Sequence, residues 1–416
     1  MENHVQLSKI INDPVHGFIE INNPKLLQII DNQLFQRLRR IKQLGLGSLV
    51  YPGATHTRFS HALGAMHLTR QAMDVLRNKQ VDITPEEYEA TLMAILLHDV
   101  GHGPFSHALE HALIPNLRHE QMSLAFMQAL NQQMEGALEL AIAIFEDRYP
   151  KKFLHQLVSS QLDMDRMDYL IRDSFFTGVA EGIVGIDRII KTLNVFEGQL
   201  VCESKAIYSV EKFVVARRLM YWQVYLHKAA VAAECMLLSI LRRARELVHR
   251  QQPLYLDENL AFFFHHNISS EQLGEEVMSR YLQLDDNDVE FHLKKWVGHP
   301  DRVLAELCER LLRRRLLKVR MKKRPFRPKK LELYLKRYMK LKGYTAEEAA
   351  YFVFSGTVSN QAYLKESEEP ILILTKEGRL RELPNESDMK NISALSKMVV
   401  KSYLCFPGEI RAAGES

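Results

Sequence analysis

Apolar residues recur at helical spacing through most of the chain, in long stretches rich in Leu, Ala, Glu, Gln, Lys and Arg. This pattern predicts a mainly α-helical fold. One helix start is explicit, because Thr84 supplies a cap, Pro85 suits the first helical position and Glu87 completes a capping box. We expect that helix to run through apolar residues to the adjacent pair His98 and Asp99.

The helical pattern continues far beyond the middle of the chain. A long helical stretch is expected from about residue 210 to residue 250, and further helices are expected to about residue 318. Pro325 and Pro328 should then interrupt the pattern, because proline removes a backbone donor and clashes with the preceding helical turn.

The last part of the chain shows a different pattern. The stretch 345–348, Thr-Ala-Glu-Glu, is typical of another helix start, but ILILTKEGRLREL around Gly378 predicts a β-hairpin and VVKSYLCF a further strand. We therefore expect a helical core in residues 1–255 and a C-terminal helical and α/β extension in residues 256–416.

Composition narrows the class of protein. A chain of 416 residues exceeds the roughly 250–300 residues at which one core stops growing, which supports two regions. With 46% hydrophobic and 25% charged residues, the chain is neither disordered nor disulfide-dense. The four cysteines show no CxxC spacing, which fits a reducing compartment. The first residues lack a signal-peptide pattern and no apolar run approaches the roughly 20 residues of a membrane span, so we expect a cytoplasmic protein without a membrane partner.

Histidines are crowded into one part of the chain. Eight of the 17 fall between His56 and His119, where even scattering would place about three. They are His56, His61, His67, His98, His102, His107, His111 and His119. Because a neutral imidazole binds divalent metals and titrates near neutral pH, the crowding indicates metal or proton-transfer chemistry.

The run LLHDVGHGPFSHALEH contains the sharpest signal. Adjacent side chains in a helix point about 100° apart, so His98 and Asp99 can converge on one ion only where the helix ends. Gly101 and Gly103 permit the backbone to turn there. The helix dipole disfavours a carboxylate at this end, and a bound cation would offset that cost.

Three segments resemble the HD superfamily: HTRFSHALG at 56–64, LLHDVGHGPFSH at 96–107 and DMDRMDYLIRD at 163–173. More narrowly, INDPVHG, FQRLRRIKQLG and PGATHTRFSHALG resemble the deoxynucleoside triphosphate triphosphohydrolase branch, which contains the SAM- and HD-domain triphosphohydrolase and its bacterial relatives. These motifs cover about residues 8 to 230. The resemblance implies a mainly α fold with an HD-domain helical core in residues 1–255 and a small α/β subregion near the C-terminus.

The resemblance also implies the reaction and the metal ligands. The expected activity is metal-dependent cleavage of a deoxynucleoside triphosphate to a deoxynucleoside and triphosphate. The four implied ligands of one divalent ion per chain are His61, His98, Asp99 and Asp165. This donor set suits Mn, Fe, Zn or Ni and tolerates Mg. Without the resemblance, Asp163 or Asp165 could merely cap the following helix.

Further catalytic roles follow from the same match. His119 is implied as the general acid that protonates the leaving 5′ oxygen, supported by Glu110, where the family usually has aspartate. His102 and His107 are implied near the α-phosphate. The remaining histidines of the crowded segment, His56, His67 and His111, are expected to have no ligand role.

The implied substrate contacts divide by the part of the nucleotide they meet. Arg58, Arg166 and Arg217 match phosphate contacts, with Arg166 standing where relatives carry lysine. Tyr169 is implied to pack on the sugar and Asp173 to accept from its 3′ hydroxyl. The positions around sugar and base are Gln43, Leu44 and Tyr225. From the residues alone, core packing would be favoured for both tyrosines.

An activator pocket is implied near the N-terminus, where relatives bind a guanine nucleotide that promotes tetramer assembly. The matching residues are Lys9, Ile10, Asn12, Asp13, His16, Asp31, Gln36 and Arg39. A carboxylate such as Asp31 can accept from guanine N1–H and N2–H₂, while Arg39 donates to O6 and N7. The resemblance thus implies GTP or dGTP as activator and a homo-oligomer, a dimer or tetramer. The alternative is that Asp31 is only a helix-surface carboxylate with Arg39 as its structural partner, since Glu203 and Gln223 fall where arginines are usual.

The run 310–330 holds twelve basic residues and no acidic one, but the net charge is only +4. A solvated cationic helix face over an apolar stripe is our first interpretation, with nucleic-acid binding or a regulatory phosphate site as alternatives. For the whole chain, the alternatives are an HD phosphohydrolase or phosphodiesterase acting on another nucleotide, or a non-catalytic binder of nucleotide or nucleic acid.

Overall fold

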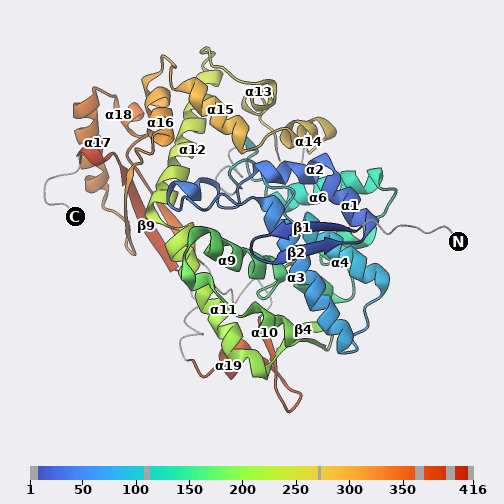
Figure 1. Cartoon of the computed structure of the whole chain (residues 1–416). Coiled ribbons are helices and arrows are strands. Elements are labelled where there is room, and N and C mark those ends of the chain that lie inside the picture. Colours follow the sequence, from blue (N-terminus) through green and yellow to red (C-terminus); the bar gives the residue numbers. More distant parts are fainter. Residues whose placement is uncertain (1–7, 107–112, 270–272, 361–369, 390–398, 411–416) are drawn as a thin grey trace.

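The computed structural model describes residues 8–106, 113–269, 273–360, 370–389 and 399–410. Helices dominate these residues and small sheets lie at three places, so the predicted mainly α fold is confirmed (Figure 1). Within the described part of the chain, no single helix is both long and apolar enough to cross a membrane. The segments Ser204–Tyr225 and Lys228–His249 pass such a test only as a pair bent by 56°.

The helices are α1 (Pro24–Asp31), α2 (Gln33–Gln36), α3 (Arg58–Asn78), α4 (Pro85–Leu97), α6 (His119–Gln133), α7 (Glu139–Phe145), α8 (Lys152–Val158), α9 (Met164–Thr177), α10 (Ile186–Lys191), α11 (Ile207–Met220), α12 (Lys228–His249), α13 (Glu258–His265), α14 (Glu275–Leu282), α15 (Asp286–Trp296), α16 (Arg302–Leu312), α17 (Pro328–Lys342), α18 (Ala346–Ala349) and α19 (Leu383–Glu386). The strands are β1 (Lys9–Asp13), β2 (Gly17–Ile21), β3 (Leu193–Phe196), β4 (Gln199–Glu203), β5 (Lys318–Lys322), β6 (Phe354–Asn360), β7 (Leu372–Leu374), β8 (Leu380–Glu382) and β9 (Val399–Phe406).

Local hydrogen-bond chemistry defines the start of α4 as predicted. The Thr84 hydroxyl accepts from Glu87 N at 3.2 Å, and the Glu87 carboxylate accepts from Thr84 N at 2.9 Å. From Thr91 to Leu97 every side chain is buried, so α4 is the central helix of the core and packs against α3 and α7. It ends at Leu97, which leaves His98 and Asp99 at the end of a buried helix.

A cap also defines α9. The Asp163 carboxylate accepts from Arg166 N at 2.6 Å, and Gly178 ends the helix in the left-handed conformation that glycine favours. Asp163 is therefore the capping residue, and Asp165 lies in the first turn with its carboxylate available for another role.

The helical stretch predicted from about residue 210 to residue 250 is confirmed, but it is broken once. Helix α11 ends at Met220, a π-helical turn spans Tyr221–Tyr225, and α12 begins at Lys228 after His227 caps it. No glycine or proline marks the break in the sequence. The wider turn directs Tyr225 to Asp173 on α9, so a tertiary contact accompanies the change of direction.

The predicted hairpin and strand near the C-terminus are confirmed. Strands β7 and β8 pair antiparallel across a turn at Gly378, whose φ is +74°, and β9 lies between β5 and β6. Strand β7 also pairs in parallel with β4, with Ile373 opposite Cys202. The β7–β8 hairpin, red at the bottom of Figure 1, thus pairs with β4, a strand of the first 255 residues.

The helical interpretation of the basic run is wrong beyond Leu312. Helix α16 ends there and the chain continues into β5, so the run has no single helical face. Arg310 is buried between Glu306 and Glu409, as a structural ion pair. Pro328 does not interrupt a helix but occupies the first turn of α17, where its missing N–H costs nothing. The expected helix start at 345–348 is confirmed as a capping box, but α18 is only four residues long.

Candidate metal centre

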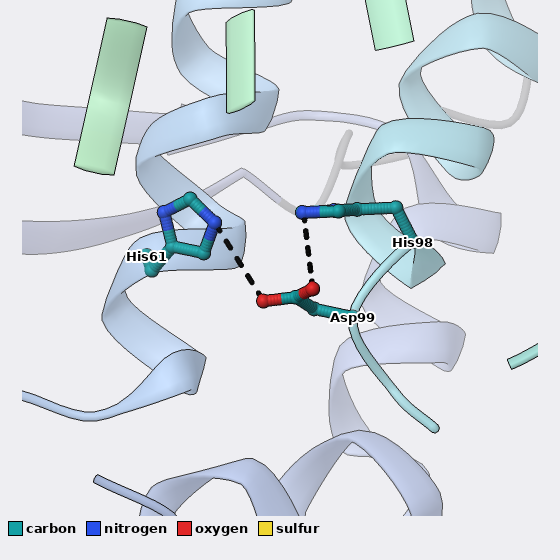
Figure 2. A group of neighbouring side chains, drawn as sticks. All are labelled: His61, His98 and Asp99. Atoms are coloured by element: carbon teal, nitrogen blue, oxygen red, sulfur yellow. Dashed lines mark ion pairs between the residues drawn. The ribbon is translucent and has the colours of Figure 1, made fainter. Parts of the chain in front are cut away.

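Three helices bring the four predicted ligands together. His61 comes from α3, His98 and Asp99 from the end of α4, and Asp165 from the first turn of α9. His61 Nε2 lies 3.0 Å from Asp165 Oδ1 and 3.7 Å from Asp99 Oδ2. His98 Nε2 lies 3.4 Å from Asp99 Oδ1 and 3.5 Å from Asp165 Oδ1. Figure 2 shows both imidazoles directed at the Asp99 carboxylate.

Hydrogen bonds at Nδ1 of His61 and His98 leave the Nε2 atom of each imidazole facing the cluster. His61 Nδ1 donates to Asp168 Oδ2 at 2.8 Å, and His98 Nδ1 donates to the Ile95 carbonyl at 2.6 Å. The buried Nε2 atoms of both residues have no hydrogen-bond partner among the described residues, although carboxylate oxygens lie close to them. Two such nitrogens and two carboxylates are a donor set that fits a divalent transition metal.

Charge in the cluster is arranged to keep the carboxylates ionised. Burial alone would raise the pKa of Asp99, but Arg58, His98 and His61 outweigh it and hold that pKa well below its usual range. Burial lowers the pKa of His61, but Asp165 and Asp168 outweigh it and raise the pKa to about 10. Both shifts have the same physical cause, which is the close approach of carboxylates to imidazole and guanidinium groups in a buried site.

Neither of the two glycines after Asp99 has a positive φ, so the backbone conformation does not require glycine there. Both positions instead require glycine because neighbouring atoms pack closely against them. A Cβ on Gly101 would lie 2.2 Å from the His119 carbonyl oxygen and 2.3 Å from Ser123 N. Ser123 Oγ accepts from Gly101 N at 2.9 Å and donates to the His98 carbonyl at 2.8 Å. The end of α4 thus rests directly on the start of α6, which fixes where His98 and His119 stand.

We expect Gly101→Ala to destabilise the protein by about 1–3 kcal/mol, because the new methyl group would force α4 and α6 apart. Urea unfolding followed by circular dichroism measures the loss. Gly185→Ala is the matched control, since no described atom lies within 4 Å of its Cβ position. Equal stability of the two variants would contradict the close packing at Gly101.

His102 and His119 form a second layer beside the cluster. Their ring centroids lie 3.8 Å apart, and His102 Nδ1 is 3.3 Å from Asp99 Oδ1. Ligand atoms of Asp99, His102 and His119 all lie within 4.8 Å of one another. His119 Nδ1 is also 3.5 Å from Glu120, the next residue on α6. The predicted residues His107 and Glu110, and also His111, lie outside the described residues.

The three predicted phosphate contacts occupy different surroundings. Arg58 binds the Asp99 carboxylate and donates to Ser106 Oγ at 2.8 Å, so it contacts a predicted metal ligand directly. Arg217 is buried and donates to Gln161, and its Nε atom has no partner among the described residues. Arg166 lies against Ser160 and Asp163 near the start of α9.

The predicted sugar contacts are neighbours in space. Asp173 accepts from Tyr225 Oη at 2.8 Å and from His56 Nε2 at 2.7 Å. The rings of Tyr169 and Tyr225 meet edge to face with centroids 6.2 Å apart. Gln43 and Leu44 are half-buried, and Gln43 N donates to the His56 carbonyl at 3.0 Å. Of the other histidines, His67 bonds Gln71 and has no contact with the cluster ligands in the described part of the chain.

Sequence reasoning missed the residues that hold the cluster from outside. Asp168 is fully buried, and its place three residues after Asp165 was the available signal. Asp286 on α15 accepts from Phe105 N at 2.7 Å and Lys42 N at 2.9 Å, which ties the loop after the cluster to the C-terminal half. Nothing in the sequence indicates that contact, since the partners are about 180 and 240 residues apart.

The predicted activator residues divide into an exposed and a buried set. Lys9 pairs with Asp31 at 3.2 Å on the surface, and Arg39 donates to Gln36 at 2.8 Å. Ile10 and Asn12 are also exposed. Asp13 and His16 face inward instead and bond Arg172 and Asp168.

Two family models and several known proteins match this chain. The HD domain family model matches residues 58–173, and the HD associated region model matches residues 184–351. The Uncharacterized protein YwfO of Bacillus subtilis is 32% identical over 392 residues, 91% of this chain and 88% of that protein. The human deoxynucleoside triphosphate triphosphohydrolase SAMHD1 is 31% identical over 291 residues, 59% of this chain and 46% of that protein. The chain thus spans about half the length of that relative.

Two solved structures share the whole fold. A phosphohydrolase from Bacteroides thetaiotaomicron superposes with a TM-score of 0.92 at 48% identity, covering 96% of this chain and 100% of that chain. A hypothetical protein from Aquifex aeolicus superposes with a TM-score of 0.72 at 26% identity, covering 97% and 98%.

Proposed function

The chain belongs to the HD-domain family and is a metal-dependent phosphohydrolase, and from this premise we propose that it cleaves deoxynucleoside triphosphates to deoxynucleoside and inorganic triphosphate. The observation that carries the proposal is the face of α9. Asp165, Tyr169 and Asp173 follow at intervals of four residues, so one helix presents a metal ligand, an aromatic ring and a carboxylate in a row. A row of this kind suits the phosphate, sugar ring and 3′ hydroxyl of one nucleotide.

The residues divide the reaction among them. A divalent ion held by His61, His98, Asp99 and Asp165 would polarise the α-phosphoryl group. Water attacks the α-phosphorus in line with the 5′ oxygen and loses a proton to solvent, the bond between phosphorus and the 5′ oxygen breaks, and His119 gives its proton to the leaving oxygen. Arg217 and Arg166 neutralise phosphate charge, with His102 and His107 near the α-phosphate and Glu110 supporting His119.

Sugar selection is assigned to the group around Asp173. The Asp173 carboxylate already accepts hydrogen bonds from Tyr225 and His56 in this structure. A substrate 3′ hydroxyl would donate a further hydrogen bond to the same carboxylate. We assign the Tyr169 ring to the sugar face, where it would exclude a 2′ hydroxyl. Gln43 and Leu44 lie toward the base, and Arg58 supports Asp99 while reaching phosphate.

A product assay tests the proposed reaction. The purified protein is incubated with Mn²⁺, with and without GTP, and with each of the four dNTPs, the ribonucleoside triphosphates, deoxynucleoside monophosphates and cyclic nucleotides, and products are separated by anion exchange. We expect deoxynucleoside and triphosphate in equal amounts from dNTPs alone. Orthophosphate, pyrophosphate or monophosphate as product would assign the alternative of an HD phosphohydrolase on another nucleotide. Binding without turnover would assign a nucleotide sensor.

We further propose that a guanine nucleotide, GTP or dGTP, activates a cytoplasmic homo-oligomer, a dimer or tetramer. The proposed pocket comprises the exposed residues Lys9, Ile10, Asn12, Asp31 and Arg39 with half-buried Gln36. Asp31 is 63% exposed and pairs only with exposed Lys9 among the described residues, so its carboxylate is open to guanine N1–H and N2–H₂. Arg39 covers the Phe59 ring at 3.5 Å from the centroid, which holds its guanidinium near the same surface.

Asp31→Ala is expected to abolish stimulation by GTP while leaving metal content unchanged. The measurements are dATP hydrolysis with and without GTP and the oligomer mass by light scattering. Asp82→Ala is the matched control, because Asp82 is another exposed carboxylate paired with a lysine, Lys151, at 2.8 Å. Maximal hydrolysis without GTP, or full stimulation of Asp31→Ala, would show that this surface pair is only structural.

A further inference from the structure

A buried carboxylate on α9 stands behind the metal ligand His61. Asp168 Oδ2 accepts from His61 Nδ1 at 2.8 Å, and Asp168 Oδ1 accepts from His16 Nε2 at 2.6 Å. Arg172, one helical turn later, donates to both oxygens at 2.8 and 3.0 Å. The Asp168 and Arg172 side chains are fully buried, so these bonds are made away from water.

The chain of contacts continues into the turn between β1 and β2. Arg172 Nη1 donates to Asp13 Oδ2 at 2.7 Å and Nη2 donates to Asp13 Oδ1 at 3.2 Å. Asp13 Oδ1 also accepts from the backbone N–H groups of Val15 and His16 at 3.0 and 2.9 Å, which shapes the turn that carries His16. The same turn therefore supplies two side chains to the α9 pair.

Helix α3 is adapted to this network at Gly64. A Cβ there would lie 2.0 Å from Asp168 Oδ1 and 2.3 Å from Arg172 Nη2. Only a residue without a side chain allows Asp168 and Arg172 to lie against the α3 backbone, three residues from His61 on the same helix. Three separate segments, β1–β2, α3 and α9, thus share one buried polar network.

We propose that the turn between β1 and β2 is part of the metal centre: Asp168 is a positioning residue for His61, and Asp13 and His16 fix Asp168 and Arg172 in place. A carboxylate that accepts Nδ1–H fixes the imidazole tautomer, directs the Nε2 lone pair at the ion and makes it a stronger donor. Metal affinity then depends on the position of the β1–β2 hairpin relative to α9.

That hairpin is a surface element on its other face. Ile10 and Phe18 are 59% and 71% exposed, while Ile19 and Ile21 of the same hairpin are buried in the core. In Figure 1 the two dark blue strands lie across the front of α3. A displacement of the hairpin would move His16 and Asp13, and through Asp168 it would loosen His61. This inference concerns metal affinity alone and does not depend on which nucleotide is cleaved.

The test compares Mn²⁺ dissociation constants, measured without nucleotide by competition with a chelating dye. Asp168→Asn keeps the size of the side chain but loses its charge, and we expect about 10–100-fold weaker binding. His16→Ala removes one hydrogen bond to Asp168, and we expect about 2–10-fold weaker binding. His16→Gln restores a donor near the Nε2 position and should recover most of the affinity.

Asp301→Asn is the matched control. Asp301 is a largely buried carboxylate paired with Arg243 at 2.6 Å, so its loss destabilises the fold without touching the metal ligands. Native Mn²⁺ affinity in folded His16→Ala and Asp168→Asn would overturn the proposal, as would equal weakening in Asp301→Asn. If Asp168→Asn fails to fold, His16→Ala with its rescue by His16→Gln decides alone.

Discussion

Asp99→Ala is expected to leave the purified protein without its divalent ion and to reduce hydrolysis by about 10³-fold or more, the effect of losing several kcal/mol of transition-state stabilisation. Asp99 lies at the middle of the cluster, within 3.7 Å of both His61 Nε2 and His98 Nε2. Its carboxylate also neutralises buried Arg58, so the variant exposes the site to an uncompensated positive charge that repels a cation. His61→Ala should have the same consequence, because it removes a buried nitrogen donor.

Elemental analysis after dialysis decides this prediction. We expect about one ion per chain in the native protein and substoichiometric metal in both variants. His155→Ala is the control, because His155 is a half-buried histidine that bonds the Ile144 carbonyl and belongs to α8, which supplies no ligand. Unchanged metal content in both Asp99→Ala and His61→Ala would remove these residues from the ligand set. Circular dichroism establishes that the variants are folded before the metal is counted.

His119→Ala is expected to retain the ion and to lose about 10²–10⁴-fold in turnover, the usual contribution of a positioned general acid. His119 is the first residue of α6 and its side chain is 19% exposed, whereas the His61 side chain is fully enclosed. A proton donor must reach both substrate and solvent, and this intermediate exposure suits that task. The nearness of Asp99 and His102 makes a ligand role the competing interpretation.

Two measurements separate the roles of His119. Metal content distinguishes a proton donor, whose loss leaves the ion bound, from a ligand. A substrate analogue with a p-nitrophenolate leaving group needs no proton on departure, so we expect His119→Ala to recover most of its activity on that analogue. Asp99→Ala should show no such recovery. Near-normal turnover of dNTPs by His119→Ala would assign the acid elsewhere, with His107 as the next candidate.

The sequence by itself determined those parts of the protein that depend on neighbouring residues. The capping box at Thr84, the end of α4 at the adjacent pair His98 and Asp99, and the hairpin around Gly378 follow from hydrogen bonds within a few residues. Strand β9 was predicted within its exact bounds, because a β-branched and aromatic run has no competing helical pattern. The resemblance of the motifs supplied Asp165, a residue that local reasoning left undecided between cap and ligand.

Only the tertiary structure decided what depends on distant partners. The break before α12 exists without glycine or proline, where Tyr225 meets Asp173 on another helix. The run 310–330 has helical spacing, yet pairing with β9 makes part of it a strand. Asp168 and His16 are 152 residues apart and meet because α9 and the β1–β2 turn pack on the same side of α3. A buried charge must find a partner wherever the fold places one, and that partner is chosen in space rather than along the chain.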